Sequence, residues 1–164
     1  MNRAPAALAA LGALSFFVWL AWPVTALQVG IEGVGPLFFP VREGAAVELT
    51  WVHSVSAIPV REVFRVADGA LWLEETHNPW FAAGLGEIAG RGRTVAEAGH
   101  AVAIVDIHER AEGMALRIGS PEIHHTVRVS DRSCDLSRLA PRRRAVFEVV
   151  TLPRVYVLRG VRCE

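Results

Sequence analysis

The sequence predicts an all-β protein, an antiparallel sandwich or a partly closed barrel, behind an N-terminal signal or transmembrane segment. Two observations predict this fold. Short apolar–polar alternations recur between Gly- and Pro-containing turns along residues 27–164, as in antiparallel strands. The same residues contain no long amphipathic helical pattern, so strands are expected to form the core. We expect residues 27–164 to make a single β domain of ordinary size.

The N-terminal segment, residues 1–26, is predicted to be a signal peptide or a signal anchor. Arg3 is its only charged residue, and the apolar run Ala4–Ala26 is long enough to cross a bilayer as a helix. The last three residues of the run, Val-Thr-Ala, resemble a cleavage site. Trp19 and Trp22 are instead typical of a retained membrane anchor. We therefore expect an extracytoplasmic, periplasmic domain that is either secreted across the inner membrane or anchored in it.

Composition excludes some classes of partner. The 17 basic and 17 acidic residues cancel, so nucleic acid is not an expected partner. Cys134 and Cys163 match no metal-binding spacing. In an exported chain they are expected to form a disulfide, with two independent thiols as the alternative. No cofactor and no metal site are predicted.

Strand patterns begin with a predicted three-stranded meander. Residues 47–54 and 60–66 alternate with a period of two, and a third strand, 70–76, follows the Asp68-Gly69 turn. Asn78–Gly99 contains five glycines and is predicted to be a long irregular loop. The later predicted strands are 101–107, 114–118, 123–129, 145–151 and 155–158. Asp135 is expected to cap a single helical turn that reaches Ala140.

A candidate polar site lies on the inner face of the meander. His53 shares the alternation of Val47, Leu49 and Trp51, and Glu62 shares that of Val60, Phe64 and Val66. A turn near Ser56-Ala57 would make His53 and Glu62 diagonal neighbours, and a turn one residue later would place them opposite each other. The pair either binds a small ligand or satisfies itself and fixes the strand register.

Other constellations of residues are weaker. Ser54 follows His53 on the same strand, so the two side chains point to opposite faces and do not make a nucleophile–base pair. A metal site from His53, Glu62 and His125 has no spacing signature. The basic run Arg142–Arg144 is expected to be a solvated turn, with anionic lipid headgroups as the alternative partner.

Four runs together resemble a known family. They are Thr50-Trp51-Val52-His53-Ser54-Val55, Pro59-Val60-Arg61-Glu62, Leu71-Trp72-Leu73 and Ala83-Gly84-Leu85. This pattern resembles domain-of-unknown-function family 1850, whose members are small exported bacterial proteins. The resemblance implies frequent encoding beside TRAP transporters of the TAXI type. It departs at Gly86, where a Pro is usual, and at Ala82, where a Gly is usual.

The resemblance carries the family's motif positions onto His53, Ser54, Val55, Pro59, Val60, Glu62 and Gly84. Of these, His53, Ser54, Glu62 and Gly84 are our candidate ligand-binding residues. The preferred hypothesis is an accessory or small-ligand-binding domain outside the cytoplasm, with a small organic solute or TRAP transporter components as partners. The alternatives are an envelope enzyme that uses His53 and Glu62 as an acid–base pair, and a purely structural envelope protein.

Overall fold

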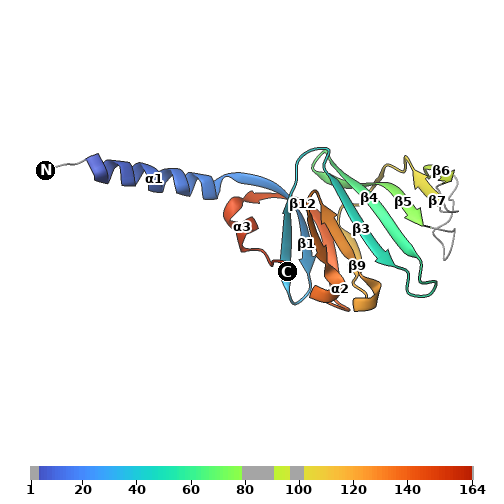
Figure 1. Ribbon diagram of the computed structural model, residues 1–164. Coiled ribbons are helices and arrows are strands. Elements are labelled where there is room, and N and C mark those ends of the chain that lie inside the picture. The colour runs from blue at the N-terminus through green and yellow to red at the C-terminus, as the bar shows by residue number, and fades with distance from the viewer. Residues whose placement is uncertain (1–3, 79–90, 97–101, 164) are drawn as a thin grey trace.

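The protein is a sandwich of two antiparallel sheets preceded by a helix that projects from it (Figure 1). The computed structural model describes residues 4–78, 91–96 and 102–163, with side chains from residue 11 onward. Among the described strands the two sheets remain separate and open. The all-β prediction is therefore confirmed, and the sandwich alternative fits better than the barrel.

The smaller sheet has the strand order β2-β1-β12-β9. Its strands are β1 (Pro23–Ile31), β2 (Gly35–Pro40), β9 (Met114–Arg117) and β12 (Arg144–Pro153). β1 and β12 pair along the whole length of β1, from Pro23 opposite Pro153 to Ile31 opposite Ala145. No strand was predicted over 23–40, and residues 23–26 were assigned to the leader.

The larger sheet has the order β11-β10-β3-β4-β5-β7-β6, with β8 paired to β5. Its strands are β3 (Ala46–Val52), β4 (Pro59–Ala67), β5 (Ala70–Asn78), β6 (Arg93–Ala96), β7 (Val102–Val105), β8 (Glu109–Arg110), β10 (Thr126–Val129) and β11 (Arg132–Asp135). The predicted meander is confirmed as β3, β4 and β5. β6 lies within the stretch that we predicted to be an irregular loop.

The core lies between the sheets and consists of the inward side chains of both. Leu27 and Phe147 come from the smaller sheet, Phe64 and Leu71 come from the larger one, and all four are almost completely buried. Burying each such side chain contributes roughly 1.5–3 kcal/mol. The Glu112 carboxylate also links the sheets.

Glu112 accepts backbone hydrogen bonds from both layers. Its Oε2 accepts from the N–H of Leu71 on β5, and its Oε1 accepts from the N–H of Val149 on β12, both at 2.9 Å. A hydrogen bond to a charged acceptor is stronger than a neutral one. This carboxylate therefore fixes the position of one sheet relative to the other.

The helix α1 (Ala4–Ala21) leads into β1 with only Trp22 between them. β1 begins before the boundary that we expected after Ala26. Ala26 is itself fully buried and lies opposite both Val150 and Pro40. Residues 23–26 are thus part of the smaller sheet. Within the described ranges, no helix is both long and apolar enough to cross a membrane.

The C-terminal part contains two short helices. The expected helical turn is present as α2 (Leu136–Leu139), and Oδ1 of its N-cap Asp135 accepts from the N–H of Arg138 at 3.0 Å. The strand predicted over 155–158 is wrong, because these residues form α3 (Arg154–Arg159). β12 ends at Pro153, opposite the first residue of β1, so the β-branched residues that follow have no partner strand.

Cys134 and Cys163 are joined in a disulfide, with their Cα atoms 5.4 Å apart. Cys134 is buried on β11. The bridge therefore attaches the C-terminal end of the chain to the edge of the larger sheet.

The strand expected over 123–129 begins only at Thr126. A 3-10 helix, η2 (Pro121–Ile123), precedes it, and His124 follows with a positive φ of 53°. This left-handed residue lets the chain turn into β10.

Candidate functional site

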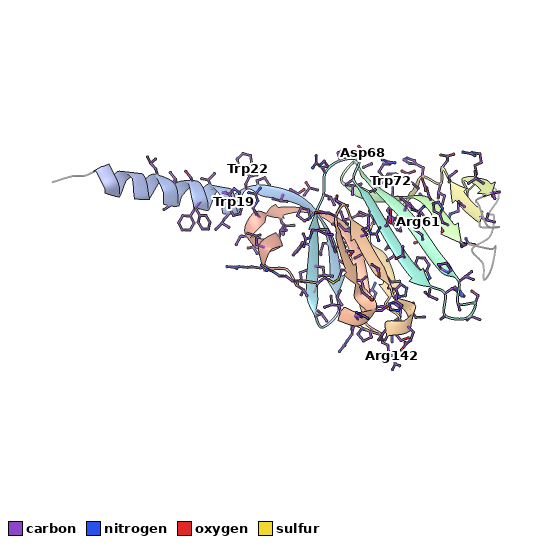
Figure 2. All side chains as sticks on the ribbon, in the orientation of Figure 1. Trp19, Trp22, Arg61, Asp68, Trp72 and Arg142 are labelled. Atoms are coloured by element: carbon purple, nitrogen blue, oxygen red, sulfur yellow. A yellow bond between two sulfur atoms is a disulfide. The ribbon has the colours of Figure 1, made fainter. Side chains whose placement is uncertain are left out.

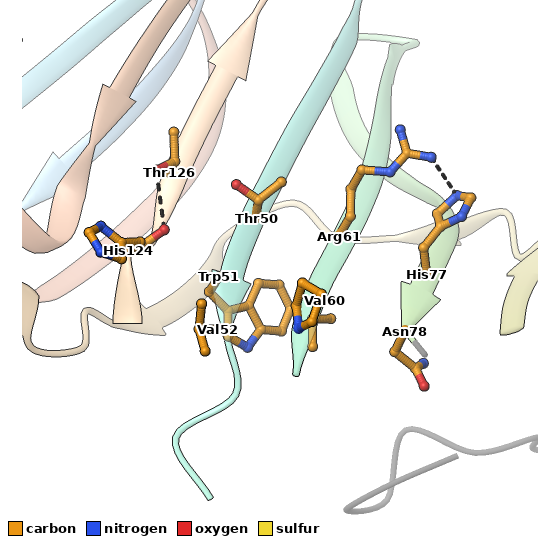
Figure 3. Close-up of a pocket in the computed structure, with 10 residues that line it drawn as sticks. Thr50, Trp51, Val52, Val60, Arg61, His77, Asn78, His124 and Thr126 are labelled. Atoms are coloured by element: carbon orange, nitrogen blue, oxygen red, sulfur yellow. Dashed lines mark hydrogen bonds between the residues drawn. The ribbon is translucent and has the colours of Figure 1, made fainter. Parts of the chain in front are cut away.

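A pocket of about 490 Å³ opens at one end of the larger sheet. It lies where β3 ends, where β4 and β10 begin, and where β5 ends (Figure 3). Its lining residues are Thr50, Trp51, Val52, Pro59, Val60, Arg61, His77, Asn78, His124 and Thr126. The pocket combines an apolar wall with a row of polar side chains.

The apolar wall is formed by the ends of β3 and β4. Val52 lies opposite Pro59 on the same face as Thr50 and Arg61, and Trp51 lies opposite Val60 on the core-facing side. The Trp51 ring stacks on the His125 imidazole, with ring centroids 5.8 Å apart and planes inclined by 22°. This stacking holds the large ring in place.

His125 is itself held firmly. It is buried, and its Nδ1 accepts from the N–H of Gly119 at 3.0 Å. Burial lowers the pKa of His125, against the opposing charge of Asp135. The neutral ring is therefore favoured, with its proton on Nε2. A neutral, fixed imidazole gives Trp51 a rigid support.

The polar row crosses four strands on the face of the sheet that points away from the core. Thr126 of β10 lies opposite Thr50 of β3, Thr50 lies opposite Arg61 of β4, and Arg61 lies opposite His77 of β5. In a strand pair such directly opposite side chains are close neighbours. The row therefore places two hydroxyls, a guanidinium and an imidazole beside one another.

Arg61 is the central charge of this row, and its side chain is 43% exposed. Its Nη2 lies 3.0 Å from Nε2 of His77. The carboxylate of Glu48 comes to 3.7 Å from Nη1, which is beyond ordinary hydrogen-bond range. Glu48 therefore orients the guanidinium electrostatically and leaves its donors available.

His77 has two competing contacts at the same nitrogen. Its Nε2 lies 2.7 Å from Oε2 of Glu75 as well as 3.0 Å from Arg61. One imidazole nitrogen either donates or accepts, so the two hydrogen bonds exclude each other. The contact with the carboxylate is shorter and charge-assisted, which favours an Nε2–H that donates to Glu75. In that tautomer Nε2 has no lone pair for Arg61.

The structure does not bring His53 and Glu62 together. Leu49, not Trp51 or His53, lies opposite Glu62. The N–H of His53 donates to the carbonyl of Ile58 at 2.8 Å, and the N–H of Ala57 donates back to the His53 carbonyl at 2.9 Å. The hairpin therefore closes earlier than we predicted, and the predicted register is wrong.

The side chains explain this register. Nδ1 of His53 lies 3.0 Å from the Ser56 hydroxyl and accepts from the N–H groups of Val55 and Ser56 at 3.4 Å. Ala57 adopts a positive φ of 54°. His53 thus stabilises its own turn, and Ser54 lies exposed within that turn. Gly84, the fourth candidate residue, lies outside the described residues.

Glu62 occupies a separate place on the core-facing side. It lies opposite Thr76 of β5 as well as Leu49. Burial raises the pKa of Glu62, and the charge of Arg91 opposes that shift. The hydroxyl of Thr76 is buried and has no hydrogen-bond partner among the described residues. Glu62 is therefore a partly desolvated carboxyl apart from the pocket.

The polar row was not recognised from the sequence. Thr50 and Arg61 alternate with the apolar residues of their strands, and this pattern by itself indicates no site. The sequence carried no sign that His77 and Thr126 complete the row, because the row depends on which strands are neighbours in the sheet.

The comparisons with known proteins identify a family for this chain through a match to its sequence model. The model of Domain of unknown function (DUF1850) matches residues 47–136. The chain belongs to this family. The matched residues run from β3 to the start of α2 and include every residue that lines the pocket. No curated protein and no solved structure matches the chain.

Proposed function

We propose that this protein binds a small organic anion, with the charged group on Arg61 and an apolar body against Val52 and Pro59. The observation that carries the proposal is the Arg61 guanidinium, which lines the pocket with its nearest contacting carboxylate at 3.7 Å. Arginine presents paired N–H donors that match the two oxygens of a carboxylate. An anion in the pocket would satisfy donors that Glu48 and His77 leave available.

The size and composition of the pocket support a small molecule. Ligand pockets usually enclose roughly 300–1,000 Å³, and their walls are mostly apolar with a few convergent polar groups. This pocket, of about 490 Å³, has that composition: Val52 and Pro59 lie on the same face as the polar row. The hydroxyl of Thr50 would add a hydrogen bond to the same anion, whereas the hydroxyl of Thr126 already donates to the carbonyl of His124.

The proposal includes a location outside the cytoplasm. The Cys134–Cys163 disulfide supports it, because such bonds persist mainly in oxidising compartments. The apolar N-terminal segment also supports it. A TRAP-type solute transporter is the proposed partner, and the support is the family's resemblance alone. A binding domain for organic anions would suit a transporter of small solutes.

The acid–base enzyme has less support than binding. It required His53 and Glu62 in contact, and the hairpin register separates them. His53 is engaged in its turn, and Glu62 faces the core. The polar row contains His77 beside Glu75, but its hydroxyls, those of Thr50 and Thr126, lie on β3 and β10, with β4 between them and β5.

Thermal shifts and calorimetry of the full chain test the proposal. Benzoate and isovalerate should bind and raise the melting temperature, because a ligand that prefers the folded state stabilises it. Benzamide, which keeps the ring but has no charge, should bind much more weakly. Arg61→Gln should weaken benzoate binding by roughly tenfold or more, the value of a hydrogen bond to a charged group.

Arg65→Gln is the matched control. Arg65 lies on the same strand and the same face as Arg61, outside the pocket, and its Nη1 donates to the carbonyl of Gly44. This variant should bind benzoate as the wild type does. Equal binding of benzoate by the wild type and Arg61→Gln, or equal binding of benzoate and benzamide, would refute the anion site.

A further inference from the structure

The junction of α1 and α3 has a surface unlike the rest of the molecule. The Arg154 guanidinium lies over the Trp19 ring, 4.5 Å from its centroid. The N–H of Arg154 donates to the carbonyl of Trp22 at 3.0 Å. Figure 2 shows Trp19 and Trp22 where α1 meets the sandwich. A cation over an indole face holds both groups near the base of α1.

This surface is apolar and exposed. Leu11, Leu14, Phe16, Phe17 and Val18 of α1 are each at least half exposed. Exposed side chains point from all sides of the helix, so α1 has no polar face to turn toward water. Exposed apolar residues of this size gathered in one place mark an interaction surface.

α3 extends this surface with amphipathic and basic residues. Tyr156 is 55% exposed and Leu158 is 50% exposed. α1 contains no charged residue, and the charges of α3 are Arg154 and Arg159, with no carboxylate in either helix. The partner of this surface must therefore offer apolar groups to α1 and hydrogen-bond acceptors to the two arginines of α3.

The backbone fixes both helices at the same end of the molecule. β1 starts at Pro23, directly opposite Pro153, where β12 ends. α1 precedes the first of these residues and α3 follows the second. Figure 1 shows α1 and α3 at one end of the sandwich and β6 and β7 at the other. A partner that contacts the base of α1 therefore also comes close to α3.

We propose that this junction, formed by α1, Trp22 and α3, rests on a lipid bilayer. The apolar side chains of α1 enter the acyl region, and the rings of Trp19, Trp22 and Tyr156 lie at the level of the headgroups. Tryptophan and tyrosine favour that level because their rings are apolar and their N–H or O–H groups are polar. Arg154 and Arg159 contact lipid phosphates, with their aliphatic parts against the apolar surface.

Charge favours lipid over a second copy of the chain. Two copies joined through this surface would bring their α3 arginines together, and neither helix supplies a carboxylate to offset the repulsion. Phosphate groups of a bilayer offset the same charges. The proposal is independent of the anion pocket, which lies at the end of the larger sheet.

Vesicle flotation and hydrogen exchange of the full chain test this proposal. The chain should float with vesicles of phosphatidylethanolamine and phosphatidylglycerol. Backbone amides of α3 should exchange roughly fivefold or more slowly on the vesicles than in the lipid-free chain, because lipid contact suppresses local opening. The double variant Tyr156→Ser, Leu158→Ser should lose this protection. Both residues are exposed, so an unchanged melting temperature will verify its fold.

Val55→Ser is the matched control. Val55 is 88% exposed in the β3–β4 turn, away from both helices, and this variant should keep the α3 protection. A chain that floats while its α3 amides exchange at the lipid-free rate would overturn the proposed seating of α3. A chain that stays with the aqueous phase, or that forms a dimer in place of floating, would overturn the lipid partner.

Discussion

Arg61 and Glu62 are adjacent on β4 but belong to opposite faces of the larger sheet. Arg61 lines an open pocket with its donors toward solvent and neighbouring polar groups. Glu62 faces the core, where burial raises its pKa. The two faces differ in water access, and the same strand thus carries an available charge and a disfavoured one. Water access, more than residue type, decides which polar group can serve a ligand.

The comparison extends to the neighbouring threonines. Thr50 lies opposite Arg61 on the pocket face, and Thr76 lies opposite Glu62 on the core face. The Thr76 hydroxyl is buried without a hydrogen-bond partner in the described part of the chain, which costs free energy of folding. Thr50 is half-buried in the pocket wall. Substitutions on the core face should therefore change stability, and those on the pocket face should change binding.

The largest expected effect is on the core face. Phe64→Ala should lower the free energy of unfolding by about 3–5 kcal/mol, because it leaves a cavity among fully buried side chains. Val63→Ala, next to it on the outer face, should cost less than about 1 kcal/mol. Urea unfolding of both variants measures the difference. Equal losses would show that the outer face is packed as the core is.

A smaller effect of opposite sign is expected at Thr76. Thr76→Val keeps the shape of the side chain and removes a buried hydroxyl that has no partner among the residues described. The free energy of unfolding should rise by about 1 kcal/mol. A loss of stability in the same urea experiment would mean that the hydroxyl has a partner in solution.

Glu62→Gln should change the pH dependence of stability. Because the pKa of Glu62 is raised in the folded state, the folded protein holds this proton more tightly than the unfolded chain. Wild-type stability that comes from the protonated carboxyl is present at low pH and is lost as the pH rises through the folded pKa. Glutamine does not titrate.

The variant should therefore gain stability relative to the wild type as the pH rises from the ordinary carboxyl range toward neutrality. Denaturant unfolding of both proteins across that range measures the gain. Arg91 opposes the pKa shift, so we expect this effect to be smaller than that of Thr76→Val. A difference in stability that does not vary with pH would contradict the raised pKa.

The smallest stability effect is expected on the pocket face. Thr50→Val should change the free energy of unfolding by less than about 0.5 kcal/mol. If the anion site is right, the variant should still weaken benzoate binding, by a few-fold, because it removes one hydrogen bond. Calorimetry beside urea unfolding separates the two effects. A large loss of stability with unchanged binding would reverse the assignment of the two faces.

Much of the fold could be predicted because its cause is local. The alternation of β3 and β4 assigns Val47, Leu49, Val60 and Phe64 to the buried face, and all four are buried. Asp135 caps its helical turn as expected, since capping involves only residues within one turn. The strand expected over 155–158 failed for the opposite reason. Strand formation needs a neighbour, and local sequence does not supply one.

The candidate site was predicted less well. His53 and Glu62 do share the core-side alternation, but the turn between them was placed too late. His53 accepts hydrogen bonds from Val55 and Ser56 and closes the hairpin early. The strand register is thereby shifted by two residues, and Leu49 takes the place of Trp51 opposite Glu62. Alternation specifies a face and leaves the register open.

The sequence by itself determined the all-β class, the faces of the meander strands and membership of the family. These follow from residue patterns of short range. Only the tertiary structure decided that β10 lies beside β3 and β5 beside β4, which aligns Thr126, Thr50, Arg61 and His77 in one row. It also decided that α1 and α3 meet, through the pairing of β1 with β12. Both arrangements join residues far apart in the chain, and their pairing depends on the packing of the whole sandwich.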